Sequence, residues 1–167
     1  MVCGVPGSGK TKLAKKIVKK INACYIDKDT IQNSFTKKRE GSLYKLIRDR
    51  SYNIMYNIAF SNLKVDKDVV IVAPHVKEML RESWIRYISM KAKNSNVMIK
   101  VIWCYAPEKI IKERLKKRDY KRDEKKLKNW NEFLKEQPIR VKIPFEFIEI
   151  DTSKKYRLNE IVKFLEE

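Results

Sequence analysis

Two patterns of apolar residues alternate along the chain. Short runs of mostly apolar residues are separated by longer stretches in which apolar residues recur every three or four positions. Short runs are typical of buried strands, and the wider spacing is typical of amphipathic helices. The runs predict strands at residues 1–3, 23–27, 69–72, 97–105 and 145–150. Because helices separate them, we expect an α/β fold with a five-stranded, mostly parallel sheet and a ligand at the carboxyl ends of its strands.

The helical stretches predict which side chains face the core. Each stretch carries one apolar stripe, opposite a face that is rich in lysine in the first helix. The predicted stripes are Leu13, Ile17, Val18 and Ile21; Leu43, Leu46, Ile47, Ile54 and Ile58 in a helix at 42–63; Leu80, Trp84, Tyr87 and Ile88; and Leu158, Ile161, Val162 and Leu165. We expect Trp84 to belong to the core rather than to a base-stacking surface.

The length of 167 residues predicts a single domain, 1–167. No apolar run approaches the roughly 20 residues that span a bilayer, and no signal-peptide pattern precedes the first motif, so we expect a cytoplasmic protein. Cys3, Cys24 and Cys104 lie in apolar stretches and form no C-x-x-C pair. They are therefore expected to be buried thiols rather than metal ligands or disulfide partners.

The chain is strongly basic. Lys and Arg number 39 against 21 Asp and Glu, which gives a formal net charge of +18. Such an excess favours an anionic partner, whether a nucleotide, a phosphorylated metabolite or a nucleic acid. Lys, Asn and Ile are abundant throughout, so a general composition bias is the alternative explanation.

The best-defined motif opens the chain. Residues 4–11, Gly-Val-Pro-Gly-Ser-Gly-Lys-Thr, match the phosphate-binding pattern G-x-x-x-x-G-K-[S/T] at every fixed position. In such a loop, backbone N–H groups surround a polyphosphate, the lysine reaches the β- and γ-phosphates, and the hydroxyl binds Mg²⁺. A flexible turn before a helix is the alternative. The expected phosphate contacts come from Gly4, Pro6, Gly7, Ser8, Gly9, Lys10 and Thr11.

The strand before this loop is short. A phosphate-binding loop normally follows a strand of about five residues, whereas only residues 1–3 precede it here. Either this strand is unusually short or the natural N-terminus lies upstream.

Two carboxylates follow the second predicted strand. Asp27 and Asp29 would emerge at the carboxyl edge of the sheet, the edge that also carries the loop. A base for phosphoryl transfer must lie at that edge, but the spacing leaves open whether both side chains face it. A helix cap formed by Asp29 is the alternative, and it does not exclude a catalytic role.

An arginine-rich segment follows the fourth predicted strand. Residues 109–128 contain eleven basic and four acidic residues, and Arg114, Arg118 and Arg122 share one face if a single helix runs through them. An arginine fork can neutralise the charge that develops on a transferring phosphoryl group. A solvated basic helix is the alternative. An apolar stripe is expected to pack this lid, at about 114–137, against the domain: Leu127, Trp130, Phe133 and Leu134.

Together, the phosphate loop, the D-x-D after the second strand, and the arginine-rich lid resemble the P-loop kinases, in particular the group of polynucleotide kinases, zeta toxins and gluconate-kinase-like enzymes. The resemblance implies a three-layer P-loop NTPase fold, with ATP and Mg²⁺ as cofactors. It implies that Asp29 is the base that activates the acceptor hydroxyl, that Arg118 and Arg122 act from the lid, and that Thr11 and Asp27 hold the metal. Further nucleotide contacts would come from Arg114, Arg118, Asp151, Thr152 and Ser153.

Two departures from the group bear on function. The family often has an aspartate at the end of the third strand, where this chain has Ala73 and Pro74, and Asp27 or Asp29 would have to hold the metal instead. Gln32 stands where a polynucleotide kinase has an arginine for the acceptor-side phosphate, which weakens the nucleic-acid hypothesis. His75 would lie at the same edge of the sheet, where a contact with substrate is a minor alternative.

These observations predict an ATP-dependent phosphotransferase that acts on a hydroxyl acceptor, a small molecule or a 5′-hydroxyl nucleic acid. One rival is a nucleotide-hydrolysing switch with water as the acceptor. A second is a nucleic-acid-binding protein with a vestigial loop, whose affinity would fall steeply with salt.

Overall fold

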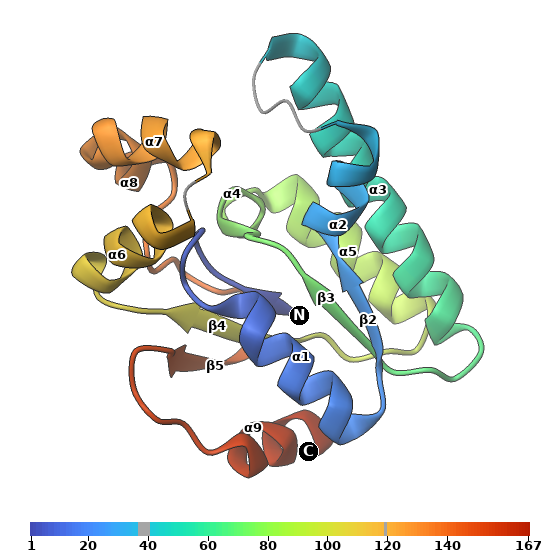
Figure 1. Cartoon of the computed structure of the whole chain (residues 1–167). Coiled ribbons are helices and arrows are strands. Elements are labelled where there is room, and N and C mark those ends of the chain that lie inside the picture. The colour runs from blue at the N-terminus through green and yellow to red at the C-terminus, as the bar shows by residue number, and fades with distance from the viewer. Residues whose placement is uncertain (37–40, 119) are drawn as a thin grey trace.

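A computed structural model describes residues 1–36, 41–118 and 120–167, with only the backbone for residues 121 and 122. Its sheet is built from β1 (Val2–Cys3), β2 (Cys24–Asp27), β3 (Val69–Val72), β4 (Lys100–Tyr105) and β5 (Glu146–Asp151). The strands are all parallel, in the order β2-β3-β1-β4-β5 (Figure 1). In the centre, Val2 pairs with Val72 on one side and Ile102 on the other. This confirms the predicted five-stranded α/β architecture.

The connections between the strands are helical. The helices are α1 (Lys10–Ile21), α2 (Lys28–Phe35), α3 (Gly41–Leu63), α4 (Val76–Met79), α5 (Glu82–Asn94), α6 (Glu108–Arg118), α7 (Lys121–Lys128), α8 (Trp130–Glu136) and α9 (Leu158–Glu166). None of them, over the described residues, has the length and apolar character needed to cross a membrane.

The helices form a layer on each face of the sheet. On one face, Leu13 and Ile17 of α1 and Ile161 of α9 pack against Val70 and Ile102 of the strands. The apolar residues of α3, α5, α6 and α8 join a second cluster on the other face. Figure 1 shows α6, α7 and α8 on one side of the carboxyl edge and α2 with the start of α3 on the other. The phosphate loop therefore lies between these two groups of helices.

The predicted buried face of α3 is wrong. Leu43, Leu46 and Ile58 are exposed, and the helix buries a different stripe. That stripe consists of Ser51, Tyr52, Met55, Tyr56 and Ala59. The reason is chemical: the Tyr56 hydroxyl accepts a hydrogen bond from Trp84 Nε1 and contacts His75 Nε2, so tyrosine can be buried there without an unmet polar group.

The helix expected around Trp84 is also corrected in part. Trp84 and Ile88 are buried, as predicted, but Tyr87 is 39% exposed. Leu80 is exposed because it lies between α4 and α5 rather than on one continuous helix. Cys3 and Cys104 are buried, whereas Cys24 is only half-buried, with its Sγ donating to Asn62 Oδ1 at 3.3 Å.

The first strand is two residues long, and β4 begins three residues later than predicted. Val97 N donates to Ala92 O at 3.0 Å, which closes a turn at the end of α5. Residues 97–99 therefore belong to the connection, although they are apolar. β5 spans residues 146–151 instead of 145–150.

Candidate active site

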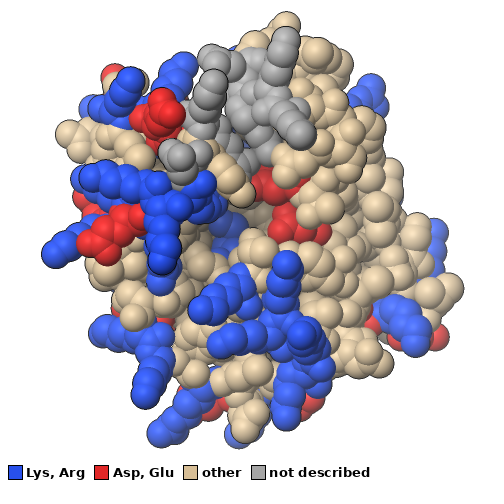
Figure 2. All heavy atoms as spheres, viewed as in Figure 1, with Lys and Arg blue, Asp and Glu red and all other residues tan. Residues whose placement is uncertain are grey.

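A cavity of about 210 Å³ opens at the carboxyl edge of the sheet. Its wall includes the phosphate loop, the ends of β2 and β3, residues of α3 and α4, and side chains of the lid. Figure 2 shows Lys and Arg side chains gathered over the lid and over α1, on the face that carries this edge. The surroundings therefore favour an anionic ligand.

A backbone hydrogen bond to the segment after β3 helps to fix the phosphate loop. Gly4 N donates to Pro74 O at 3.0 Å, just beyond β3. The loop then leads directly into α1, whose N-cap is Gly9 with a φ of 87°. A Cβ at Gly9 would lie 2.8 Å from Thr152 Oγ1, so glycine is required for backbone conformation and for space.

Lys10 and Thr11 both line the cavity, as the motif predicts. Lys10 Nζ donates to Val5 O at 2.9 Å, so its ammonium group lies across the loop. Burial lowers the pKa of Lys10 to about 8. Pro6 also lines the cavity, while Ser8 is fully buried within the loop.

Several buried polar atoms have no hydrogen-bond partner in the described part of the chain. They include Ser8 Oγ in the loop and Arg118 Nε and Trp130 Nε1 in the lid. Unpaired buried polar groups are costly, so native structures usually satisfy them with water or a ligand. Of these residues, Arg118 lines the cavity, and an arginine there, facing the same space as the phosphate loop, suits a phosphate ligand, so the site fits a nucleotide.

Asp27 and Asp29 both line the cavity, which resolves the direction that the sequence left open. Asp27, not Asp29, caps α2: its Oδ1 accepts from Asp29 N at 2.8 Å, and its Oδ2 accepts from the Tyr25 hydroxyl at 2.9 Å. Asp29 lies in the first turn, 42% exposed, with Oδ1 2.5 Å from Lys28 Nζ. The cap turns the chain so that both carboxylates reach the same edge.

Thr11 and Asp27, the residues expected to hold Mg²⁺, both line the cavity, and their role as metal ligands stays a prediction. Each Asp27 oxygen accepts one hydrogen bond and keeps a lone pair, and Thr11 is exposed. Mg²⁺ commonly takes one or two protein ligands and fills its shell with water and phosphate oxygens, so this donor set fits the ion. At the end of β3 the cavity is lined by Val72, Ala73 and Pro74, and no carboxylate stands there.

The arginines of the lid do not share one continuous helix. α6 ends at Arg118 and α7 begins at Lys121, so the condition under which Arg114, Arg118 and Arg122 would share one helix face is not met. The Arg122 side chain lies outside the described part of the structure. Arg118 lines the cavity and donates from Nη2 to Asp123 Oδ2 at 2.7 Å.

Asp123 and Lys126 belong to the same site, and sequence reasoning gave neither a role. Asp123 is 1% exposed, and Lys126 Nζ lies 2.5 Å from its Oδ1. Lys126 lines the cavity with Arg118. One buried carboxylate thus holds two cations at the cavity wall. The three-residue spacing of Asp123 and Lys126, which places them on one face of a helix, was the sequence signal that could have predicted this ion pair.

Arg114 and Thr152 support the loop from behind. Arg114 Nη1 donates to Gly7 O at 3.2 Å and to Thr152 Oγ1 at 2.8 Å, and Nη2 donates to Thr152 O at 2.8 Å. The Thr152 hydroxyl donates to Ser8 O at 2.8 Å. Asp151 Oδ1 accepts from the backbone and hydroxyl of Ser153, which closes a turn. None of these four residues lines the cavity, and their contact with a nucleotide stays a prediction.

His75 does not line the cavity, so the geometry argues against its minor alternative role as a substrate contact. It is fully buried, with Nε2 2.9 Å from the Tyr56 hydroxyl and Nδ1 3.5 Å from Cys3 Sγ. Burial lowers the pKa of His75 to about 3, so the ring is neutral. The residue belongs to an aromatic cluster with Tyr52, Tyr56 and Trp84.

The chain resembles known proteins in sequence and in fold. The model of the AAA domain family AAA_33 matches residues 1–137, whereas no curated protein matches the chain. A protein from Chloroflexus aurantiacus proposed to be a kinase superimposes with a TM-score of 0.71 at 14% identity, covering 99% of this chain and 91% of that one. A sugar kinase from Janibacter gives 0.65 at 16% identity, covering 97% and 88%.

A third similar structure is the APS kinase of Mycobacterium tuberculosis in complex with AMPPNP and APS. It gives a TM-score of 0.65 at 17% identity, covering 99% of this chain and 95% of that one. At such identities the likeness shows the fold alone, and it confirms the predicted α/β P-loop kinase fold.

Proposed function

The chain belongs to the AAA domain family AAA_33, and we propose that it is a P-loop kinase that moves the γ-phosphate of ATP to a hydroxyl acceptor. The observation that carries the proposal is that Lys10, Asp29 and Arg118 line one cavity although they come from distant segments. ATP as the donor, Mg²⁺ as the metal, a single domain at 1–167 and a cytoplasmic location are parts of this proposal.

The donor half of the site binds the triphosphate. Backbone N–H groups of the loop and the Lys10 ammonium neutralise the β- and γ-phosphates. Arg118 and Lys126 stabilise the charge that develops on the transferring group from the opposite wall. Thr11 and Asp27 would hold Mg²⁺, which would supply further neutralisation of the phosphate charge.

The acceptor half activates the hydroxyl. The acceptor oxygen bonds to the γ-phosphorus while the bond to the β-γ bridging oxygen breaks, ADP leaves, and the hydroxyl proton passes to the Asp29 carboxylate. Lys28, which is 5% exposed, donates to Gln32 Oε1 at 2.7 Å and contacts Asp29. We infer that this contact keeps the Asp29 carboxylate in a fixed orientation.

The test follows label from γ-labelled ATP with Mg²⁺ into a panel of small alcohols and 5′-hydroxyl oligonucleotides. Lys10→Ala should abolish turnover, because the phosphate clamp is lost. Asp29→Asn should retain ATP binding in calorimetry but lose at least a hundredfold in transfer, because a general base typically contributes 10²–10⁴-fold. Asp66→Asn is the matched control, since Asp66 lies in an exposed turn outside the cavity. Full transfer by Asp29→Asn would overturn the assignment of the base.

One observation gives weight to a nucleotide hydrolase as a second candidate. The cavity wall at the end of β3 is Val72, Ala73 and Pro74, without the carboxylate that many kinases of this fold place there. Product analysis separates the two functions: a kinase phosphorylates an organic acceptor, and a hydrolase yields only phosphate and ADP. The comparisons do not support a nucleic-acid acceptor, and membership of the polynucleotide kinase and zeta toxin group stays a prediction.

A further inference from the structure

The wall of the cavity opposite the lid carries an arginine that the phosphate chemistry does not use. This wall is formed by Tyr44, Arg48 and Tyr52 of α3 and by Lys77 and Glu78 of α4. Figure 1 places α3 on the far side of the opening from α6 and α7. An acceptor that approaches Asp29 from this side would lie against Arg48.

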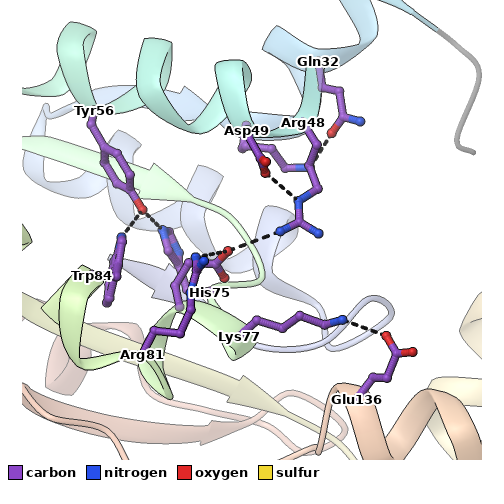
Figure 3. A network of polar contacts seen from close by, with 11 residues as sticks. Gln32, Arg48, Asp49, Tyr56, His75, Lys77, Arg81, Trp84 and Glu136 are labelled. Atoms are coloured by element: carbon purple, nitrogen blue, oxygen red, sulfur yellow. Dashed lines mark hydrogen bonds and ion pairs between the residues drawn. The ribbon is translucent and has the colours of Figure 1, made fainter. Parts of the chain in front are cut away.

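Arg48 has unused hydrogen-bond donors. Its Nε lies 3.4 Å from Asp49 Oδ1 and its Nη2 lies 3.7 Å from Glu78 Oε1, both beyond the roughly 2.7–2.9 Å of a good charge-assisted hydrogen bond. Its Nε is buried and makes no hydrogen bond to any residue that the structure describes. Figure 3 shows the remaining terminal nitrogen of Arg48 joined to none of the residues drawn.

The nearby acidic groups leave hydrogen-bond donors of Arg48 available for a ligand. Glu78 is 4% exposed, but it is shared with Arg81, whose Nη2 lies 3.6 Å from the same Oε1. Asp49 has a side chain that is 68% exposed, so water screens its attraction. Arg81 does not line the cavity, whereas Arg48 does. Of these two arginines, Arg48 is therefore the one that can offer hydrogen-bond donors to a ligand in the cavity.

A second cation stands on the same wall. Lys77 lines the cavity, and its Nζ donates to Glu136 Oε2 at 2.7 Å (Figure 3). This pair joins α4 to the end of α8, so it also connects the acceptor wall to the lid. The pair is solvent-exposed on both sides, which leaves the Lys77 ammonium able to exchange its partner for a ligand oxygen.

From these contacts we infer that the acceptor is a small alcohol that also carries an oxyanion, a carboxylate or a phosphate, bound by the Arg48 guanidinium. The planar fork of arginine matches the two oxygens of such a group, and a partly dehydrated wall strengthens the contact. The cavity volume of about 210 Å³ must also hold the transferred phosphoryl group, so the acceptor is metabolite-sized. The inference rests on the proposed kinase function and adds the acceptor class to it.

The experiment separates this inference from the kinase proposal by filling the donor half first. Protein saturated with Mg²⁺ and the non-hydrolysable analogue AMP-PNP is titrated by calorimetry with inorganic phosphate and, separately, with glycolate. At least one of these anions should bind, and Arg48→Gln should raise its Kd by about tenfold or more, because a charge-assisted hydrogen bond is lost. The phosphate and glycolate arms distinguish the two oxyanions. If AMP-PNP itself does not bind, the kinase proposal has failed.

The matched control is Arg50→Gln. Arg50 is an exposed arginine on the same helix that does not line the cavity, so this variant removes the same charge and should change the Kd less than twofold. Arg48→Lys keeps the charge without the planar fork and should weaken binding to a lesser degree, which provides a second variant if Arg48→Gln does not fold. With AMP-PNP bound, the inference is overturned if neither anion binds, or if Arg50→Gln weakens binding as much as Arg48→Gln.

Discussion

Single glycines in this chain combine two constraints that can be separated experimentally. Gly9 and Gly41 have the same φ of 87°, a left-handed value that costs other residues about 1–2 kcal/mol. A Cβ at Gly9 would meet Thr152 Oγ1 at 2.8 Å, whereas a Cβ at Gly41 would meet no atom of the residues that the structure describes within 4 Å. The two positions thus share the backbone cost and differ in the steric one.

We predict that Gly41→Ala lowers the free energy of unfolding by about 1 kcal/mol, which is the backbone cost alone. Gly9→Ala should lower it by about 1–3 kcal/mol more, because the methyl group forces the loop away from Thr152. Urea unfolding of the two variants and the wild type measures both the backbone cost and the added steric cost. Equal losses in the two variants would show that the contact at Thr152 relaxes freely.

How far single residues could be predicted depends on the distance between partners in the sequence. The roles proposed for Lys10 and Thr11 follow from a motif with fixed spacing, and the structure places both residues at the cavity, so their position could be predicted from the sequence. Arg48 and His75 form contacts that depend on the fold: His75 meets Cys3 across 72 residues. No local spacing encodes such contacts, and the sequence could not reveal them.

At the scale of elements, α6 has two parts: Arg118 lines the cavity, and Arg114 acts as a brace, that is, a side chain that holds the phosphate loop against the segment after β5. Arg114 bonds to Gly7 O in the loop and to both oxygens of Thr152 after β5, so one side chain links three segments. A brace acts whether or not a nucleotide is bound. A residue that only contacts the nucleotide affects affinity and leaves the stability of the free protein unchanged.

We therefore predict that Arg114→Ala lowers the free energy of unfolding of the nucleotide-free protein by about 2–3 kcal/mol, because half-buried hydrogen bonds to a charged group are lost. Lys117→Ala, at an exposed position of the same helix, should change it by less than about 0.5 kcal/mol. Chemical denaturation without nucleotide measures both. An Arg114→Ala variant as stable as the wild type would contradict the brace and favour direct nucleotide contact.

The positions of the elements could be predicted better than the faces they bury. Apolar runs and helical spacing gave the order of strands and helices, since both patterns are local. The prediction of which face of α3 is buried was wrong because leucine and isoleucine were expected to be the buried residues, whereas Tyr52 and Tyr56 are buried. The break between Arg118 and Lys121 has no glycine or proline to signal it.

At the scale of the whole molecule, the buried cluster around His75 couples folding to pH. The pKa of His75 is about 3 in the folded chain and about 6.5 in an unfolded chain. Between these values the unfolded state binds a proton that the folded state does not. The contribution of neutral His75 to the free energy of unfolding is therefore fully present above pH 6.5 and is lost as the pH is lowered toward 3.

We predict that this one group contributes a slope of about 1.4 kcal/mol per pH unit to the free energy of unfolding between pH 6 and 4. His75→Asn, which suits the φ of 53° at this position, should be less stable at pH 7 but should lack that part of the slope. Urea unfolding at several pH values compares the two slopes. Parallel curves for the two proteins would show that His75 is not the proton-linked group.

The segment after residue 137 contributes to the structure of the phosphate loop, although it lies beyond the part of the chain that matches the family. The family match ends there, yet the hydroxyl of Thr152 donates to the main chain of the phosphate loop. A fragment cut at the boundary of the match would carry the complete motif and lack the neighbour that gives the loop its shape. We therefore expect the smallest portion of the chain that keeps the loop in its folded geometry to reach past β5.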